Sequence, residues 1–276
     1  MRLTELTEGY PHASKFCDLR NINLTTLKGV DFSKYDSFAS ILLDGNYLTD
    51  LEGSPTEAGS EFSADNNELT SLRGAPKIVR GSFSVIDNPT LSTLEGGPEE
   101  VGTYYYAMFA RDLKSLEGIA RKIGGGINFG KCGLTTMRGL SAKWLDTVSV
   151  QSNKLTDLMY SPRDVGEFDA SSNKLLSLKG APAEIDQRLW LDNNNSLTNL
   201  KGIGREFILR CPSISMLNCP IKSHALGLCL VKKLEELEGD FPGIEILRKY
   251  MSQGHDALID CQHELIEAGL EELAQL

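Results

Sequence analysis

The sequence predicts a solenoid, a fold in which one structural repeat is stacked many times. The repeat is about 21 residues long and is clearest at residues 167–182, which read E-F-D-A-S-S-N-K-L-L-S-L-K-G-A-P. A glycine returns in steps of 24, 21, 22, 22, 21, 41 and 22 residues, and Tyr160 stands midway in the longest step. Such a fixed period is typical of repeats that bury their core against their neighbours. The glycines are Gly29, Gly53, Gly74, Gly96, Gly118, Gly139, Gly180 and Gly202.

Each repeat combines a short strand with an asparagine that follows it. Phe168 and Ala170 alternate with polar residues, which indicates a strand with one buried face. Asn173 comes next, where leucine-rich repeats turn an amide inward to bond backbone groups, because a buried amide needs partners. Gly180 is expected to take a positive φ at the following turn. This asparagine site, called the ladder position below, is held elsewhere by Asn46, Asn67, Asn88, Cys132, Asn153 and Asn194.

The segments that return to the next strand, such as residues 183–187, are too short for a helix. We therefore expect a leucine-rich repeat solenoid with a parallel β-sheet on the concave face, short extended or 3-10 backs, and a small α-helical C-terminal cap. The predicted domains are an N-terminal cap with a partial repeat (1–15), the solenoid (16–219) and the helical cap (220–276). Strands are expected to begin near Cys17, Ile41, Phe62, Phe83, Tyr105, Ile127, Val148, Phe168, Leu189 and Phe207.

The two ends of the array are less regular. In the first repeat, Asn21 and Ile22 both fit the ladder position. The last repeat, at Phe207, is eroded and has Pro212 at that position. After it, apolar residues recur three and four apart, which predicts one helix across residues 226–237 and two more before the end of the chain.

Composition and charge exclude several classes of function. Hydrophobic residues make up 41% of the chain and charged residues 24%, as in folded proteins. A net charge of −10 argues against nucleic-acid binding through phosphate neutralisation. No apolar run approaches the roughly 18 residues of a membrane span, and the start lacks a secretory pattern. We expect no membrane partner, a cytoplasmic location, and six free, buried cysteines in a reducing compartment.

No residue pattern indicates an active site, a metal site or a cofactor, so we expect a non-enzymatic protein. Cys261 and His263 lie two apart on a predicted helix and point to different faces, which argues against a metal site with His255. Residues 124–126 are three glycines but lack the Lys-Ser/Thr of a phosphate loop, and we interpret them as a turn. Cys229 and Cys261 could suggest a cysteine-dependent ubiquitin ligase, but the segment is too short for that domain.

The outward side chains of the strands are the candidate binding residues, because the repeat does not dictate them. One strand projects three large side chains and has lost its ladder asparagine to Ala110, and later strands project a tryptophan and an isoleucine. Exposed aromatic residues beside charged ones are typical of protein-binding hot spots. A register shifted by one residue, or a covering loop, is the alternative. The predicted protein-binding residues are Tyr104, Tyr106, Met108, Glu167, Asp169, Arg188, Trp190, Asp192, Ile208 and Arg210.

Two segments resemble the leucine-rich repeat proteins of tailed bacteriophages. They are residues 66–76, N-N-E-L-T-S-L-R-G-A-P, and residues 260–270, D-C-Q-H-E-L-I-E-A-G-L. The resemblance covers nearly the whole chain and implies a protein made inside an infected bacterium. The group has no generally established activity, so the resemblance supplies no catalytic residue. Residues 103–110 depart from the regular pattern of the group.

Three hypotheses of function follow. The leading one is a non-enzymatic module in the host cytoplasm that docks its acidic sheet face on a basic site of a host protein and inhibits a defence or metabolic enzyme. The second is a structural or receptor-contacting virion component, which mass spectrometry of purified particles would reveal. The third is a cysteine-dependent effector, which requires a reactive thiol at Cys229 or Cys261.

Overall fold

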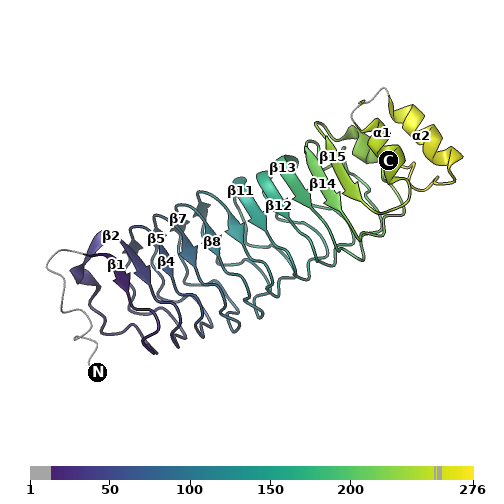
Figure 1. The fold of residues 1–276 in the computed structure, drawn as a ribbon. Helices are drawn as coiled ribbons and strands as arrows, with labels where there is room; N and C mark the ends of the chain where they lie inside the picture. The colour runs from purple at the N-terminus through teal and green to yellow at the C-terminus, as the bar shows by residue number, and fades with distance from the viewer. Residues whose placement is uncertain (1–13, 252, 254–256) are drawn as a thin grey trace. The chain divides into compact units, whose positions relative to one another are not determined.

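The computed structural model describes residues 14–251, 253 and 257–276, without the side chains of residues 14, 15 and 36–38. Most of the predicted N-terminal cap and His255 lie outside these residues. The chain divides into two compact units, Met1–Leu134 and Thr135–Leu276. Each is a parallel-strand β-solenoid, and the second ends in a small helical cap (Figure 1). Within the described ranges, no helix is long and apolar enough to cross a membrane.

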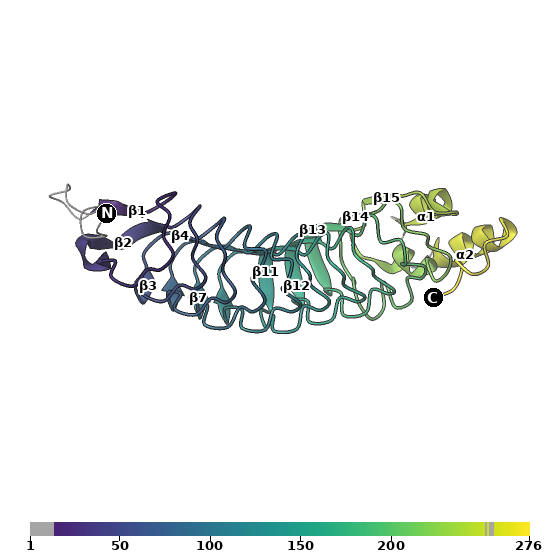
Figure 2. The ribbon, with the colours of Figure 1, turned by 90° about the horizontal axis from the view of Figure 1, so that it is seen from below.

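The first unit has two parallel sheets on different sides of its coils (Figure 2). The main sheet contains, in order, β1 (Ser14–Asp18), β2 (Tyr35–Leu42), β4 (Phe62–Ser63), β6 (Phe83–Ser84), β8 (Tyr105–Tyr106) and β10 (Ile127–Asn128). The second contains β3 (Glu57–Ala58), β5 (Ile78–Val79), β7 (Glu100–Val101) and β9 (Lys122–Ile123). A 3-10 turn, η2 (Phe32–Lys34), precedes β2. The backs of these coils are extended, as the short return segments predict.

The second unit contains parallel strands and the helices of the cap. Its strands are β11 (Trp144–Ser149), β12 (Asp164–Asp169), β13 (Glu184–Trp190), β14 (Ser213–Met216) and β15 (Glu236–Gly239), paired in that order. Its helical elements are η3 (Leu226–Leu230), α1 (Ile244–Tyr250) and α2 (Leu258–Glu267). The two α-helices lie beyond β15 at the C-terminal end of this unit (Figure 1).

The strand register confirms that nine of the ten predicted residues occupy equivalent positions in the repeat, although β1, β2, β11, β12 and β13 begin several residues earlier than predicted. From Cys17 to Ile127, each predicted residue lies opposite the next one in the first unit, and Val148, Phe168 and Leu189 do so in the second. All nine side chains are buried. Neighbouring rings pack along the core of the first unit: Phe62 and Phe83 are stacked with centroids 5.5 Å apart, and Phe83 meets Tyr105 edge-to-face at 5.0 Å.

The tenth predicted strand is wrong. Ile214, and not Phe207, lies opposite Leu189. The chain at residues 202–207 closes a local turn, in which backbone N–H groups bond back to Gly202, and these extra residues lengthen the coil. Cys219 therefore holds the ladder position in place of Pro212, and its Sγ donates to the backbone oxygen of Leu191 at 3.1 Å.

The helix predicted across residues 226–237 is also wrong. Only Leu226–Leu230 is helical, as a 3-10 turn, and Glu236–Gly239 forms β15 with Leu237 opposite Ile214. The apolar residues that suggested a helix face are core residues of one more coil: Leu234 and Leu237 are buried. The sheet therefore continues past residue 219, and α1 and α2 alone form the helical cap.

The ladder position joins successive coils through buried amides. The backbone N–H of Leu155 donates to Asn173 Oδ1 at 3.0 Å, and Asn173 Nδ2 donates to the carbonyls of Val150 (3.0 Å) and Ala170 (3.1 Å). Cys132 keeps part of this pattern, since its Sγ donates to the carbonyl of the preceding coil at 3.0 Å. The full pattern recurs at Asn46, Asn67, Asn88 and Asn194.

Each coil turns at two left-handed positions. The residue before the ladder position has a positive φ even where it is bulky, as at Phe109 (65°) and Lys131 (56°). In the first coil the residue with this positive φ is Asn21, so Ile22, and not Asn21, holds the ladder position. The recurring glycine is the second, as predicted for Gly180 (φ 80°), and Tyr160 adopts the same conformation (φ 73°).

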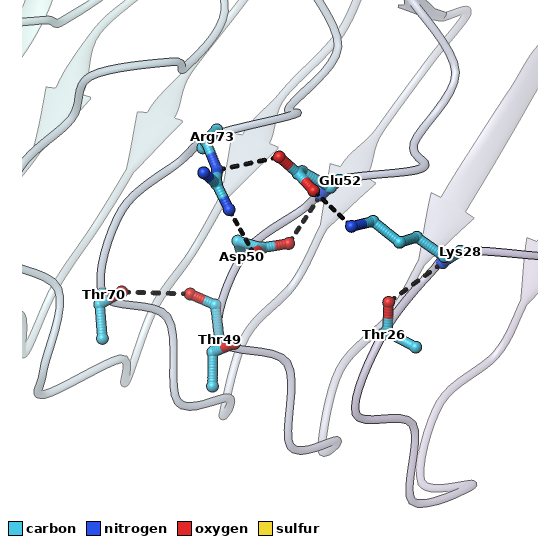
Figure 3. A network of polar contacts seen from close by, with 7 residues as sticks. All are labelled: Thr26, Lys28, Thr49, Asp50, Glu52, Thr70 and Arg73. Atoms are coloured by element: carbon cyan, nitrogen blue, oxygen red, sulfur yellow. Dashed lines mark hydrogen bonds and ion pairs between the residues drawn. The ribbon is translucent and has the colours of Figure 1, made fainter.

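A short polar side chain caps the turn before each of these glycines in most coils, a feature the sequence analysis missed. Thr26 Oγ1 accepts from the N–H of Lys28 at 3.2 Å, and Asp50 Oδ1 accepts from that of Glu52 at 2.9 Å (Figure 3). Exposed ion pairs cross these turns: Glu52 binds Lys28 (2.7 Å) and Arg73 (3.1 Å). Equivalent caps are Thr93, Ser115, Thr136, Asp157, Ser177 and Asn199.

Candidate functional site

The predicted binding residues of the second unit stand on two neighbouring rows across its sheet. In the first row, Glu167 lies opposite Arg188, Arg188 opposite Ser213, and Ser213 opposite Glu236. The second row lies two residues further along the strands and begins with Asp169 and Trp190. Side chains two apart on a strand share one face, so the two rows form one surface.

Arg188 is the most firmly held side chain of this surface. Its Nε donates to Ser213 Oγ at 2.8 Å, and its Nη2 donates to Glu236 Oε2 at 2.6 Å. Ser213 Oγ in turn donates to the same carboxylate oxygen at 3.0 Å. The guanidinium carbon lies 5.7 Å from the centre of the Trp190 ring, within the range of a cation–π contact. Arg188 therefore links the tryptophan to strands β14 and β15.

These bonds also set the charge state of Glu236. The hydrogen bond from Arg188, followed by that from Ser213, lowers the pKa of the Glu236 carboxyl below its usual range. The carboxylate form is favoured because both groups donate to it. Glu236 is thus a fixed negative charge beside the Arg188–Trp190 pair at neutral pH.

A groove of about 420 Å³ lies over this arrangement. Its lining includes Trp190 and Arg188, together with the three carboxylates of Glu167, Glu235 and Glu236. The single guanidinium is already paired with one of the carboxylates. The groove, called the Trp190 groove below, is therefore acidic, with one aromatic side chain in its wall.

Two predicted acidic residues serve the scaffold as well as the surface. Asp169 Oδ1 accepts from the N–H and the Oγ of Ser171, at 3.0 and 2.6 Å. Asp192 Oδ1 accepts from Ser215 Oγ at 2.6 Å and from the N–H of Leu217 at 2.8 Å. Both carboxylates are half-buried, so they add negative charge near the groove while they fix neighbouring backbone.

Two predicted residues lie elsewhere. Ile208 was expected to project outward, but its side chain is 0% exposed because the turn at residues 202–207 moves the next strand to Ile214. Arg210 binds Glu184 (3.4 Å) and Asp186 (3.3 Å) at the start of β13. Glu184 is six residues before Trp190, about 20 Å along an extended strand. Neither residue contributes to the Trp190 groove.

The first unit presents its own aromatic surface. Tyr104 and Tyr106 are half-buried on the outer face of β8, with their rings stacked 5.8 Å apart at an angle of 15°. Tyr105 between them is fully buried, so the predicted register is right and the one-residue shift is excluded. Met108 is half-buried two residues further on, again as predicted.

Small residues on the neighbouring coils flank this tyrosine pair. Ser84 and Asn128 lie on either side of Tyr106. A Cβ atom on Gly125 would lie 3.0 Å from the backbone oxygen of Thr103 and 3.4 Å from the Tyr104 ring. Gly124 and Gly125 are therefore more than a turn, because they allow close approach of the preceding coil and its tyrosine.

Sequence reasoning missed one aromatic residue of the same coil, Phe109. Lys131 Nζ lies 5.1 Å from the centre of the Phe109 ring, and both residues occupy the left-handed position before the ladder. That position is filled elsewhere by small or polar residues such as Asn66 and Ser172, so no periodic pattern marked Phe109 as a surface aromatic.

The predicted absence of a metal cluster can be tested only on part of the chain. Among the residues with described positions, no group of three or more His, Cys, Asp and Glu could hold a metal ion. Cys261 is buried and His263 is exposed, so they do point to different faces, and His255 lies outside the described residues.

Comparisons with known proteins add no further assignment. A scan against protein-family models, a search of curated proteins and a search of solved structures give no match for this chain. Function is therefore inferred from the chain's own residues and contacts.

Proposed function

We propose that this chain is a non-enzymatic protein-binding module that captures a basic segment of a partner protein in the Trp190 groove. The observation that carries the proposal is the Trp190 ring, braced by Arg188 in a groove with three carboxylates. Tryptophan is among the residues that most often dominate binding energy at interfaces. An acidic groove favours Lys or Arg side chains of the partner.

The fixed geometry of the groove supports this function. Binding costs free energy for every side chain that must be ordered. Arg188 already has three partners in Ser213, Glu236 and Trp190, so this part of the surface is ordered before a partner arrives. The remaining carboxylates, Glu167 and Glu235, then supply the attraction for a basic side chain.

We also propose that the coils are leucine-rich repeats and that the partner is a host bacterial protein. The buried amides at most ladder positions and the cysteine alternative at Cys132 support the first statement. The second rests on the resemblance of residues 66–76 and 260–270 to leucine-rich repeat proteins of tailed bacteriophages. In this proposal the module acts in the bacterial cytoplasm and inhibits a defence or metabolic enzyme.

The test is affinity capture from bacterial lysate with three forms of the chain. The wild type and Trp144→Ala should capture the same basic partner, whereas Trp190→Ala should lose it. Trp144 is the matched control, because it is the other tryptophan of the chain, lies in the same unit and is 48% exposed. Circular dichroism of each variant establishes that the fold persists.

Salt provides an independent arm of the test. Exposed charges are screened over about 8–10 Å at physiological ionic strength, so capture through the acidic groove should weaken as salt rises. Equal capture by Trp190→Ala and the wild type would refute the proposed site. Capture that depends on Trp190 but not on salt would refute the basic nature of the partner segment.

A further inference from the structure

Two thiols meet where the helical cap packs on the second unit. Cys229 belongs to η3 and Cys261 to α2, and their sulfurs lie 3.6 Å apart. Both are buried, with 2% and 0% of their surface exposed, and both are free thiols. This is the one thiol–thiol contact among the described residues for which a hydrogen bond is found.

The other four cysteines are in different surroundings. The Sγ atoms of Cys132, Cys211 and Cys219 donate to backbone carbonyls at 3.0 to 3.1 Å. Cys17 bonds the side chain of Tyr35. Burial raises the pKa of each of these thiols, to about 11 or 12, and it also raises the pKa of Cys229. The neighbouring thiol at 3.6 Å is therefore what distinguishes the Cys229–Cys261 pair.

A cavity lined by positively charged residues lies beside the Cys229–Cys261 pair. Cys229 lines a cavity of about 670 Å³ in the same unit. The cavity lining carries three cations, Arg205, Lys232 and Lys233, against the one carboxylate of Glu235. This excess stands out in a chain with a net charge of −10, and it favours a small anion as the occupant.

We propose that Cys229 and Cys261 form a redox-active dithiol, which a small anionic disulfide entering this cavity oxidises to an intramolecular disulfide. Glutathione disulfide has the required chemistry, because it combines a reactive sulfur–sulfur bond with several carboxylates. The product would join α2 to η3 by a covalent bond. The cap would then be tied to the coils on which it packs.

The reaction is two successive thiol–disulfide exchanges. The Cys229 thiolate attacks one sulfur of the small disulfide, forms a mixed disulfide and releases the first small thiolate. The Cys261 thiolate then attacks the Cys229 sulfur, forms the Cys229–Cys261 bond and releases the second. The two protons from the cysteine thiols end on the two released thiols, and the small disulfide takes up the two electrons.

The positions of the two thiols divide these roles. Cys229 lines the cavity and can meet the incoming disulfide, whereas Cys261 is absent from the cavity lining and can act only on Cys229. The hydrogen bond from Cys229 lowers the pKa of the Cys261 thiol, against the opposing effect of burial. The same hydrogen bond, together with burial, raises the pKa of the Cys229 thiol, so the first attack follows transfer of the shared proton from Cys229 to Cys261.

The test is thiol mapping of the full chain after exposure to glutathione disulfide. The native protein is treated, denatured, alkylated and analysed by peptide mass spectrometry. We expect one new cross-linked peptide pair, Cys229–Cys261, with the other four cysteines alkylated, and reversal by dithiothreitol. Alkylation of all six cysteines, or a cross-link through another cysteine, would overturn the proposal. This thiol mapping needs only the wild-type protein, so its result does not depend on the stability of any variant.

Two variants test the roles and the charge. Cys261→Ser should accumulate a mixed disulfide on Cys229, whereas Cys211→Ala, the matched control, should still form the cross-link. The double variant K232Q/K233Q should react several-fold more slowly with glutathione disulfide but at an unchanged rate with uncharged hydroxyethyl disulfide. Equal rates of K232Q/K233Q and the wild type with glutathione disulfide would refute an anion-selective cavity.

Discussion

Trp190 presents its ring to Arg188, with the guanidinium carbon 5.7 Å from the ring centre. The Arg188 side chain should keep its position when Trp190 is substituted, because its Nε and Nη2 are hydrogen-bonded to Ser213 and Glu236. Truncation of the tryptophan therefore removes the aromatic wall of the groove and leaves the neighbouring row of Arg188, Ser213 and Glu236 in place. This pair makes it possible to test recognition separately from folding.

Trp190→Ala should lower the affinity for the partner by about 2 kcal/mol or more, roughly 30-fold, as at other tryptophan hot spots. Trp190→Phe should retain part of the affinity because it keeps an aromatic wall. Isothermal titration calorimetry with the captured partner measures both, and Trp144→Ala is the control that should leave the affinity unchanged. A Trp190→Ala variant that binds as tightly as the wild type would move the interface elsewhere.

The Glu236 carboxyl should titrate below its usual range, because Arg188 and then Ser213 donate hydrogen bonds to the carboxylate. Its pKa in the folded state is lower than in the unfolded state, so its contribution to stability is present above the unfolded pKa, near 4.5. That contribution is lost as pH falls through the folded pKa. Carboxyl NMR titration of the wild type and of Arg188→Gln should show the pKa return toward 4.5 in the variant, and identical titration curves would contradict the arrangement.

Asn173→Ala should lower the free energy of unfolding by about 1–3 kcal/mol, because it leaves the buried Leu155 N–H without its partner. The Val150 and Ala170 carbonyls lose one amide donor each but keep Asn153 and Asn194, respectively. Chemical denaturation monitored by circular dichroism measures the loss. Asn195→Ala is the control, since Asn195 is exposed beside a ladder residue and should change stability by less than about 0.5 kcal/mol. Similar effects of the two substitutions would argue against the amide ladder as a stabilising element.

Tyr105→Phe should raise the free energy of unfolding by about 1 kcal/mol. The Tyr105 hydroxyl is fully buried and has no hydrogen-bond partner among the described residues, whereas Phe62 and Phe83 fill the same core row in neighbouring coils. The hydroxyl loses its hydrogen bonds to water on folding and gains none in return, so its removal should stabilise the folded state. Thermal denaturation gives the comparison, with Tyr106→Phe on the outer face as the variant expected to be near neutral. A clear loss of stability in Tyr105→Phe would show that the hydroxyl has a partner.

Glu52→Gln should change stability by less than about 1 kcal/mol, although Glu52 binds both Lys28 and Arg73 (Figure 3). The Lys28 and Arg73 side chains are mostly exposed, so water and salt screen both ion pairs. Denaturation at low and high salt should give a difference between Glu52→Gln and the wild type that shrinks as salt rises. A loss of stability in Glu52→Gln as large as that in Asn173→Ala would show that exposed ion pairs stabilise this fold as much as buried amides do.

The sequence predicts the coil well wherever the period is kept. Phe168 and its eight counterparts stand at the same place in the repeat, and each is buried in the expected register. Prediction fails at residues 202–207, because an insertion there adds a turn that no periodicity contains. It fails again at Leu234 and Leu237, whose spacing suits one face of a helix as well as the core of a short coil.

The candidate site is predictable in part for the same reason. Arg188 and Trp190 lie in a regular coil, so their outward direction follows from the alternation around Leu189. Ser213 and Glu236 complete the groove from coils beyond the insertion, where the predicted register was lost. The contacts of Arg188 across those strands could therefore not be foreseen, and Ile208 was placed on the surface by the same error.

The amide ladder has a consequence for how this chain can change over generations. Each amide bonds its own coil and the one before it, as Asn173 does with Ala170 and Val150. A gene duplication or deletion that spans one whole coil therefore leaves every remaining amide with carbonyls of the same kind. Such an event between β11 and β13 would move Trp190 relative to β11 by one strand spacing, about 4.8 Å, within the second unit. Recognition can thus be retuned in discrete steps while the scaffold stays intact.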